Sequence, residues 1–94
     1  MSVNASRIAE FELDLRKAFQ VQALKITDES HLHAGHAGAA SGGGHFNLEI
    51  VAPEFRGLSL VARHRAVYAA LGKHMPKEIH ALKITALTPD EIPA

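Results

Sequence analysis

The stretch HFNLEIVA (His45–Ala52) decides the fold, because its side chains alternate between polar and apolar from His45 to Ile50. This alternation is typical of a β-strand with one buried face. The segment Val21–Asp28 has the same period and predicts a second strand. The connection HLHAGHAGAASGGG (31–44) contains too much glycine for a helix or a strand. The sequence therefore predicts an antiparallel hairpin with a long loop, and long loops in compact domains are usually functional or mobile.

A helix is predicted before the hairpin and a strand near the C-terminal end. Apolar residues recur at helical spacing over Ser6–Phe19, and Asn4 or Ser6 offers an N-cap for this helix. The last strand is predicted for Ile79–Leu87, and one helical turn is expected to begin at Thr88.

A second helix is predicted between the hairpin and the last strand, over Ser59–Leu71. Gly72 follows it as a C-terminal stop, with Pro76 beyond. The residues expected on its apolar stripe are Leu60, Val61, Val67, Tyr68 and Leu71.

The order helix–strand–strand–helix–strand predicts one α+β domain over residues 1–94, an αββαβ fold whose three-stranded mixed sheet carries both helices on one face. A helical crossover returns the last strand parallel to the second strand, so both strands begin at the same end of the sheet. His80 lies at the beginning of the last strand, with the same strand parity as Leu82 and Ile84. We therefore expect His80 to lie close to the histidine-rich loop.

The composition excludes several classes of site. The 94-residue chain has ten basic and ten acidic residues, seven histidines and no cysteine. A disulfide framework, a thiolate zinc site, a thiol nucleophile and a cluster held by the chain's own thiolates are therefore excluded. The longest uncharged stretch, Ser30–Leu48, is too rich in glycine and histidine to span a bilayer, and the acidic residues among the first nineteen do not fit a signal peptide. We expect a cytoplasmic protein without membrane association.

The histidines are the candidate metal ligands, because neutral imidazole is the commonest metal ligand in proteins. Four of the seven fall between positions 31 and 45. One or two imidazoles from His31, His33 and His36 could bind iron or zinc together with His80 across the sheet end. The alternative is that these are polar loop residues that bind no metal, since no fixed ligand spacing such as HExxH is present.

The other three histidines are assigned structural roles. His45 is expected as a polar residue at a strand edge, facing away from Phe46. His64 falls on the apolar stripe of the second helix and is expected to be half-buried and hydrogen-bonded. His74 follows the end of that helix and could cap its carbonyl groups.

The basic residues are less evenly distributed than the total suggests. From Phe55 to Lys77 the chain has no acidic residue. This stretch could contact phosphates as a helix-turn-helix or KH-like surface, and the candidate residues are Arg56, Arg63, Arg65 and Lys73. The alternative is a solvated helix face. No GxSxG elbow and no lysine-containing phosphate loop is present, so we expect no catalytic site and no enzymatic activity.

Three segments together resemble the pattern of the BolA family: DESHLHAGHAG (28–38), FRGLSLVARHRAVY (55–68) and IHALKI (79–84). His45-Phe46 and Thr88-Pro89 also match, in the same order along the chain. The resemblance implies an αββαβ fold related to class II KH domains, which agrees with the element order given above.

The resemblance also implies a function in iron–sulfur trafficking and iron homeostasis. BolA-like proteins pair with monothiol glutaredoxins, and the heterodimer holds a bridging 2Fe-2S cluster. In that arrangement the glutaredoxin contributes its cysteine and a bound glutathione. The BolA-like side contributes the histidine of the last strand, which is His80 here, and a loop ligand that falls on His33, with His36 as the neighbouring alternative. No cluster is expected to be tightly bound to the isolated chain.

Other members of the family are described as DNA-binding transcriptional regulators, and that activity would use Gly57–Arg65. The absence of cysteine favours the cluster-binding role, because the thiolates must then come from a partner. A third hypothesis is that the histidine loop binds zinc or nickel without a partner, and a weak homodimer also remains open.

Overall fold

The computed structural model describes residues 3–30 and 43–92 of the chain. Within these ranges the chain forms the predicted order of two helices and three strands. The elements are α1 (Val3–Ala18), β1 (Ala23–Asp28), β2 (Gly44–Val51), α3 (Leu60–Ala70) and β3 (Ile79–Leu87). Short 3-10 helices follow β2, α3 and β3; they are η2 (Pro53–Phe55), η3 (Gly72–His74) and η4 (Pro89–Glu91). The predicted α+β fold is confirmed, whereas the relation to class II KH domains stays a prediction.

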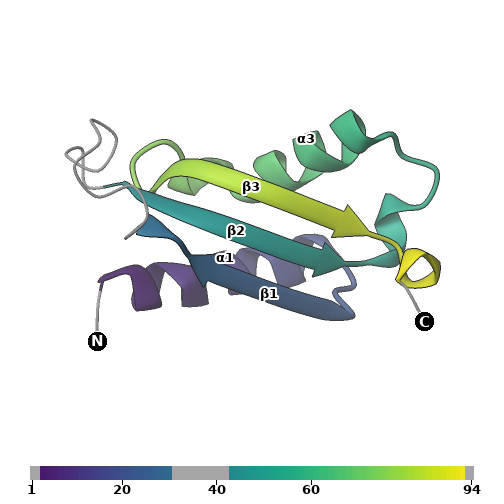
Figure 1. Cartoon of the computed structure of the whole chain (residues 1–94), viewed down its shortest axis with the longest axis horizontal. Coiled ribbons are helices and arrows are strands. Elements are labelled where there is room, and N and C mark those ends of the chain that lie inside the picture. Colours follow the sequence, from purple (N-terminus) through teal and green to yellow (C-terminus); the bar gives the residue numbers. More distant parts are fainter. Residues whose placement is uncertain (1–2, 31–42, 93–94) are drawn as a thin grey trace.

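The three strands form a mixed sheet in the order β1-β2-β3. β1 is antiparallel to β2, with Leu24 opposite Ile50. β2 is parallel to β3, with Leu48 opposite Ile84. Both helices cover the same face of this sheet (Figure 1). The predicted hairpin and the predicted parallel crossover are therefore both correct.

The hydrophobic core lies between that face and the helices, and β2 provides its centre. Phe46, Leu48 and Ile50 are buried, as their alternation with polar neighbours predicts. From α1, Phe11 meets the ring of Phe46 edge-on at 5.2 Å between centroids. The remaining buried hydrophobic residues are Leu15, Ala52, Phe55, Val67, Leu71, Ile79 and Ala86.

The start of α1 differs from the prediction. The helix begins at Val3, so neither Asn4 nor Ser6 is its N-cap. The side-chain amide of Asn4 instead donates to a carboxylate oxygen of Asp28 at 3.0 Å and to the hydroxyl of Ser30 at 3.3 Å. This side chain therefore connects α1 to the end of β1 rather than closing the first helical turn.

The predicted apolar stripe of α3 is only partly correct. Val67 and Leu71 are buried, whereas Leu60 and Val61 are 66% and 58% exposed and Tyr68 is also exposed. The sheet has three strands, and it buries only a narrow face of the helix. Ser59 caps the helix through its hydroxyl, which accepts from the Ala62 nitrogen at 3.1 Å.

The end of α3 also differs from the prediction. The helix ends at Ala70, and Gly72 starts η3 instead of forming a left-handed stop. Among the described residues, no helix is long and apolar enough to cross a membrane.

Candidate functional site

β2 and β3 begin side by side, at the end of the sheet where residues 31–42 rejoin it. Gly44 is the register partner of Ile79, and its nitrogen donates to the carbonyl oxygen of Glu78 at 3.0 Å. His80 is the next residue along β3. The connectivity argument therefore placed His80 correctly at this end of the sheet.

A β-bulge lies at His80. The register moves from Gly44 opposite Ile79 to His45 opposite Ala81, so His80 is the additional residue. Ile79 is fully buried, whereas His80 and Ala81 are both exposed. The predicted parity of His80 with Leu82 is therefore wrong, because a bulge interrupts the alternation. Because of this bulge, the His80 imidazole lies at the surface of β3, which is an edge strand.

Two neighbours pack closely against His80. The ring of His45 meets the His80 ring edge-on, with 5.2 Å between centroids and 79° between planes. His45 is only 9% exposed, because β2 is the central strand, so its predicted strand-edge position is wrong. A Cβ atom on Gly43 would lie 3.0 Å from the His80 Cβ. Gly43 therefore allows the main chain to pass close to His80.

The other end of the loop is held at the same place. The Glu29 nitrogen donates to the His45 carbonyl oxygen at 2.8 Å, and the His45 nitrogen donates to the Ser30 hydroxyl at 3.0 Å. Ser30 and Gly43 therefore both lie at the sheet end that carries His80. His33 and His36, the predicted loop ligands, lie outside the described residues, as does His31.

His74 occupies a position that the sequence did not predict. It is 2% exposed, its Nε2 lies 2.6 Å from a carboxylate oxygen of Asp14, and its Nδ1 lies 2.7 Å from one of Glu78. Both contacts are hydrogen bonds at the same time only if both ring nitrogens carry protons. The hydrogen bond from His74 lowers the pKa of Asp14. The predicted carbonyl-capping role of His74 is therefore wrong.

His64 is half-buried on α3, as predicted. Its Nε2 is buried, but it has no hydrogen-bond partner within the described part of the chain. The prediction of a hydrogen-bonded ring is therefore not met at this nitrogen.

The predicted basic surface is largely neutralised by acidic residues from other elements. Arg63 contacts both carboxylate oxygens of Glu91, at 2.6 and 2.9 Å, and its side chain is only 12% exposed. This pairing raises the pKa of Arg63 and lowers that of Glu91 to about 2. Arg56 pairs with Asp90 at 2.8 Å.

Lys73 and Arg65 complete the predicted basic set. Lys73 lies 3.4 Å from Asp14. Arg65 is exposed, and within residues 3–30 and 43–92 it forms no ion pair. Of the four residues predicted to contact phosphate, Arg65 is the one whose charge is not paired with an acidic residue in the described part of the chain.

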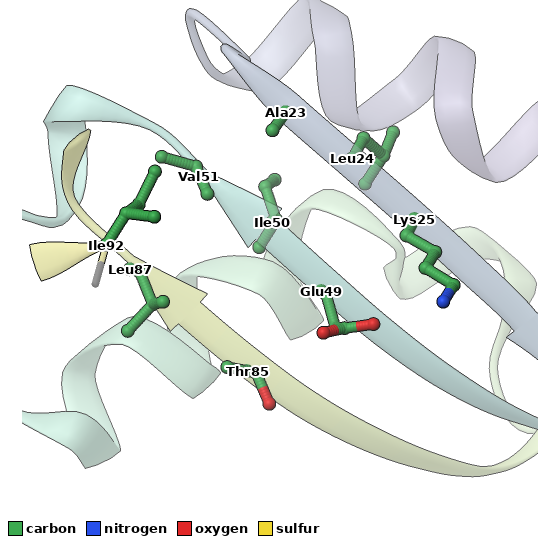
Figure 2. A pocket seen from close by; sticks show the side chains of 9 residues that line it. All are labelled: Ala23, Leu24, Lys25, Glu49, Ile50, Val51, Thr85, Leu87 and Ile92. Carbon is green, nitrogen blue, oxygen red and sulfur yellow. The ribbon is translucent and has the colours of Figure 1, made fainter. Parts of the chain in front are cut away.

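A groove of about 400 Å³ lies at the opposite end of the sheet from His80. Figure 2 shows the side chains around it. Val51 and Leu87 contribute from the ends of β2 and β3, and Ile92 contributes from the segment after η4. Lys25 and Glu49 are its charged residues. The groove brings together no set of metal-ligating groups and is separate from the histidine site.

Comparison with known proteins identifies relatives of the whole described fold. The family model for BolA-like proteins matches residues 15–91. The chain is 42% identical over 93 residues to protein BOLA1, chloroplastic, from Arabidopsis thaliana, covering 96% of this chain but only 56% of that relative. It is 38% identical over 80 residues to the DNA-binding transcriptional regulator BolA from Haemophilus influenzae, covering 85% of this chain and 75% of the relative.

A solved structure agrees with these matches. The BolA domain of SufE1 from Arabidopsis thaliana superposes with a TM-score of 0.79 at 37% identity, covering 98% of this chain and 99% of that domain.

Proposed function

Because the chain belongs to the BolA family, we propose that it is a non-enzymatic adaptor that shares a 2Fe-2S cluster with a monothiol glutaredoxin, in iron–sulfur cluster trafficking and iron homeostasis. The observation that carries this proposal is the position of His80. Its imidazole is exposed on an edge strand, at the sheet end where residues 31–42 leave and rejoin the sheet.

The donor set of the chain fits half of such a site. The sequence offers imidazoles and no thiolate. His80 would be one ligand, and His33, or His36 beside it, would be the second. The thiolates would come from the glutaredoxin cysteine and from glutathione, because this chain contains no cysteine. When bound, the cluster supplies one-electron chemistry, and imidazole in place of thiolate raises its reduction potential.

The chain's own residues would present the imidazole rather than react. The bulge turns His80 toward solvent, where a partner protein can approach it. The ring of His45 packs against His80 from the buried side. The lack of a side chain at Gly43 lets its own main chain lie close to His80. These contacts limit the positions that the His80 ring can adopt, which favours a defined ligand geometry.

The test is reconstitution with a monothiol glutaredoxin, glutathione, iron and sulfide, followed by visible circular dichroism. We expect His80→Ala to change or abolish the cluster signal of the heterodimer. His64→Gln is the matched control, because His64 lies on α3 away from the sheet end, and it should leave the signal unchanged. An unaltered spectrum in His80→Ala would contradict the ligand assignment.

A second candidate function is DNA binding, which is supported by the name of the relative from Haemophilus influenzae and by the exposed Arg65. It predicts that Arg65→Ala weakens duplex binding and that wild-type affinity falls steeply with salt. His80→Ala should have no effect on this activity. Absence of gel retardation at low salt would exclude this candidate.

The compartment is also part of the proposal. We place the protein in the cytoplasm. The plant relative is named as chloroplastic, so membership of the family does not by itself decide the compartment. Cell fractionation with immunoblotting tests this placement, and recovery in an organelle fraction would contradict it.

A further inference from the structure

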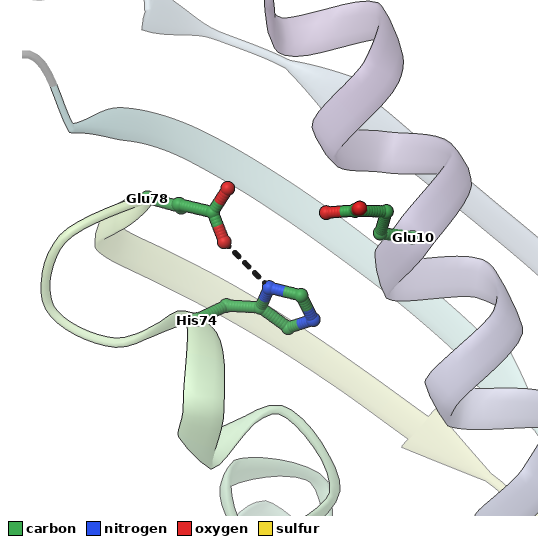
Figure 3. Close-up of side chains that lie close together, drawn as sticks. All are labelled: Glu10, His74 and Glu78. Carbon is green, nitrogen blue, oxygen red and sulfur yellow. Dashed lines mark hydrogen bonds and ion pairs between the residues drawn. The ribbon is translucent and has the colours of Figure 1, made fainter.

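A second group of metal-ligating side chains lies around His74, between α1 and the connection from α3 to β3. One ring nitrogen of His74 and carboxylate oxygens of Glu10 and Glu78 all lie within 4.8 Å of one another. Figure 3 shows Glu10 reaching from α1 toward the imidazole, with Glu78 on the other side. None of the three side chains takes part in the proposed cluster site at His80.

The centre of this group is a buried imidazole whose orientation is already fixed. Asp14 accepts a hydrogen bond from Nε2 at 2.6 Å, and Phe11 contacts the ring edge-on at 4.7 Å between centroids. A carboxylate on one ring nitrogen, with the other nitrogen directed at further donors, is the usual arrangement around a metal-bound histidine. Because Asp14 holds Nε2, Nδ1 is the ring nitrogen left for a metal ion, and Glu78 already lies 2.7 Å from it.

The distances need only small movements to accommodate an ion. Bonds of about 2.0–2.2 Å in a tetrahedral site place two ligand atoms roughly 3.3–3.6 Å apart. Nδ1 and Glu78 Oε1, now 2.7 Å apart, would separate by roughly 0.6–0.9 Å. Glu10 is exposed and Glu78 half-buried, so rotation of their side chains can supply this change.

The charge balance also favours a cation. Three carboxylates face the imidazole: Glu10 and Asp14 from α1, and Glu78 from the segment before β3. The fixed positive charges nearby are Arg7, whose Nε is 4.0 Å from Glu78, and Lys73, whose Nζ is 3.4 Å from Asp14. A divalent ion binds only a deprotonated Nδ1, so any proton shared between Nδ1 and Glu78 would leave to solvent when the ion binds.

We propose that His74, Glu78 and Glu10 form a binding site for a divalent transition-metal ion such as Zn²⁺, with water as the fourth ligand and Asp14 as the positioning residue for the imidazole. One histidine and two carboxylates are ligands that zinc accepts in proteins. This site is independent of the shared cluster, because it uses neither His80 nor the loop histidines.

The test uses the full chain with the competing histidines removed, that is with His31→Ala, His33→Ala, His36→Ala and His80→Asn. Zn²⁺ binding to this background is measured by titration calorimetry, and the ring nitrogens of His74 are followed by long-range ¹H–¹⁵N spectra. We expect one Zn²⁺ per chain and a shift of the Nδ1 resonance. Because the background lacks the proposed cluster ligands, its result does not depend on the proposed function.

Three further substitutions in that background locate the ion. Glu10→Gln changes an exposed residue and should weaken Zn²⁺ binding by at least about tenfold, and Asp14→Asn by about 10–100-fold. Glu12→Gln is the matched control on the same helix, since Glu12 pairs with Arg16, and it should leave the affinity unchanged. His74→Gln should abolish binding.

Two results would overturn the proposal. One is a background protein that binds no Zn²⁺ at millimolar concentration, which would leave an internal ion-pair group only. The other is equal affinity in Glu10→Gln and Glu12→Gln. If His74→Gln fails to fold by far-ultraviolet circular dichroism, the Glu10 pair and the Nδ1 resonance decide the question.

Discussion

Replacing Gly43 with alanine tests the close approach of the main chain to His80. An added Cβ would lie 3.0 Å from the His80 Cβ, and 3.3 Å from both the His80 nitrogen and the Lys77 carbonyl oxygen. Attractive carbon–carbon contacts begin near about 3.5 Å, so the methyl group must displace its neighbours by roughly 0.5 Å. Two of these three atoms belong to the backbone and cannot rotate away, and the third is fixed to it.

We expect two effects from Gly43→Ala. Crowding of a well-packed site should lower the free energy of unfolding by about 1–3 kcal/mol, measured by urea denaturation. The displacement should also shift the imidazole resonances of His80, and of His45 which contacts it. If His80 is the proposed cluster ligand, the cluster signal of the reconstituted heterodimer should also weaken, because the imidazole is moved from its position.

Gly72→Ala is the matched control. Its φ is not in the left-handed region, and among the described residues no heavy atom lies within 4 Å of the added Cβ. Its stability should therefore equal that of the wild type or rise slightly. The steric reasoning would be refuted if Gly43→Ala kept wild-type resonances for His80 and His45 and was as stable as Gly72→Ala.

Three other substitutions test the core, an ion pair and a helix cap. Leu48→Ala should cost about 2–5 kcal/mol in urea denaturation, because it opens a cavity in the central strand; a loss below 1 kcal/mol would contradict its core position. Glu91 has a pKa lowered to about 2 by Arg63, so its carboxylate stabilises the folded state fully above its ordinary pKa near 4.5, and this contribution disappears as pH falls toward 2. Glu91→Gln should flatten the stability–pH curve between pH 5 and pH 2, as measured by unfolding at fixed ionic strength, and an unchanged curve would show that the pair does not stabilise the fold. Ser59→Ala should cost about 1 kcal/mol by removing the cap on Ala62, and an unchanged thermal midpoint would contradict that role.

The strands and their connections were predictable because they depend on local alternation and on a general rule of chain handedness. β3 spans Ile79–Leu87 in both the prediction and the structure. The position of His80 at the sheet end where β2 begins follows from the parallel crossover, whatever the details of packing. The spacing of apolar residues in the sequence also indicates the bulge. The buried Ile79 and the half-buried Leu82, which both pack in the core, are three positions apart, which breaks a period of two.

The surroundings of His74 and of the basic stretch were not predictable in this way, because their partners are distant in sequence. Asp14 lies sixty positions from His74, and nothing in the local pattern of either residue indicates the other. The stretch from Phe55 to Lys77 contains no acidic residue, yet Glu91 from η4 pairs with Arg63. Local charge composition therefore overestimated the free positive charge of this surface.

Glu78 connects the two histidine sites, and this determines which substitutions can separate them. Its carbonyl oxygen accepts the Gly44 nitrogen where β2 and β3 begin, two residues before His80, while its carboxylate contacts His74 Nδ1. A side-chain change at Glu78 releases His74 and also alters the segment that leads directly into His80. Loss of zinc or of cluster in such a variant would thus have two causes that one measurement cannot distinguish. Glu10 approaches the imidazole from α1, so Glu10→Gln removes a proposed zinc ligand while leaving the start of β3 in place.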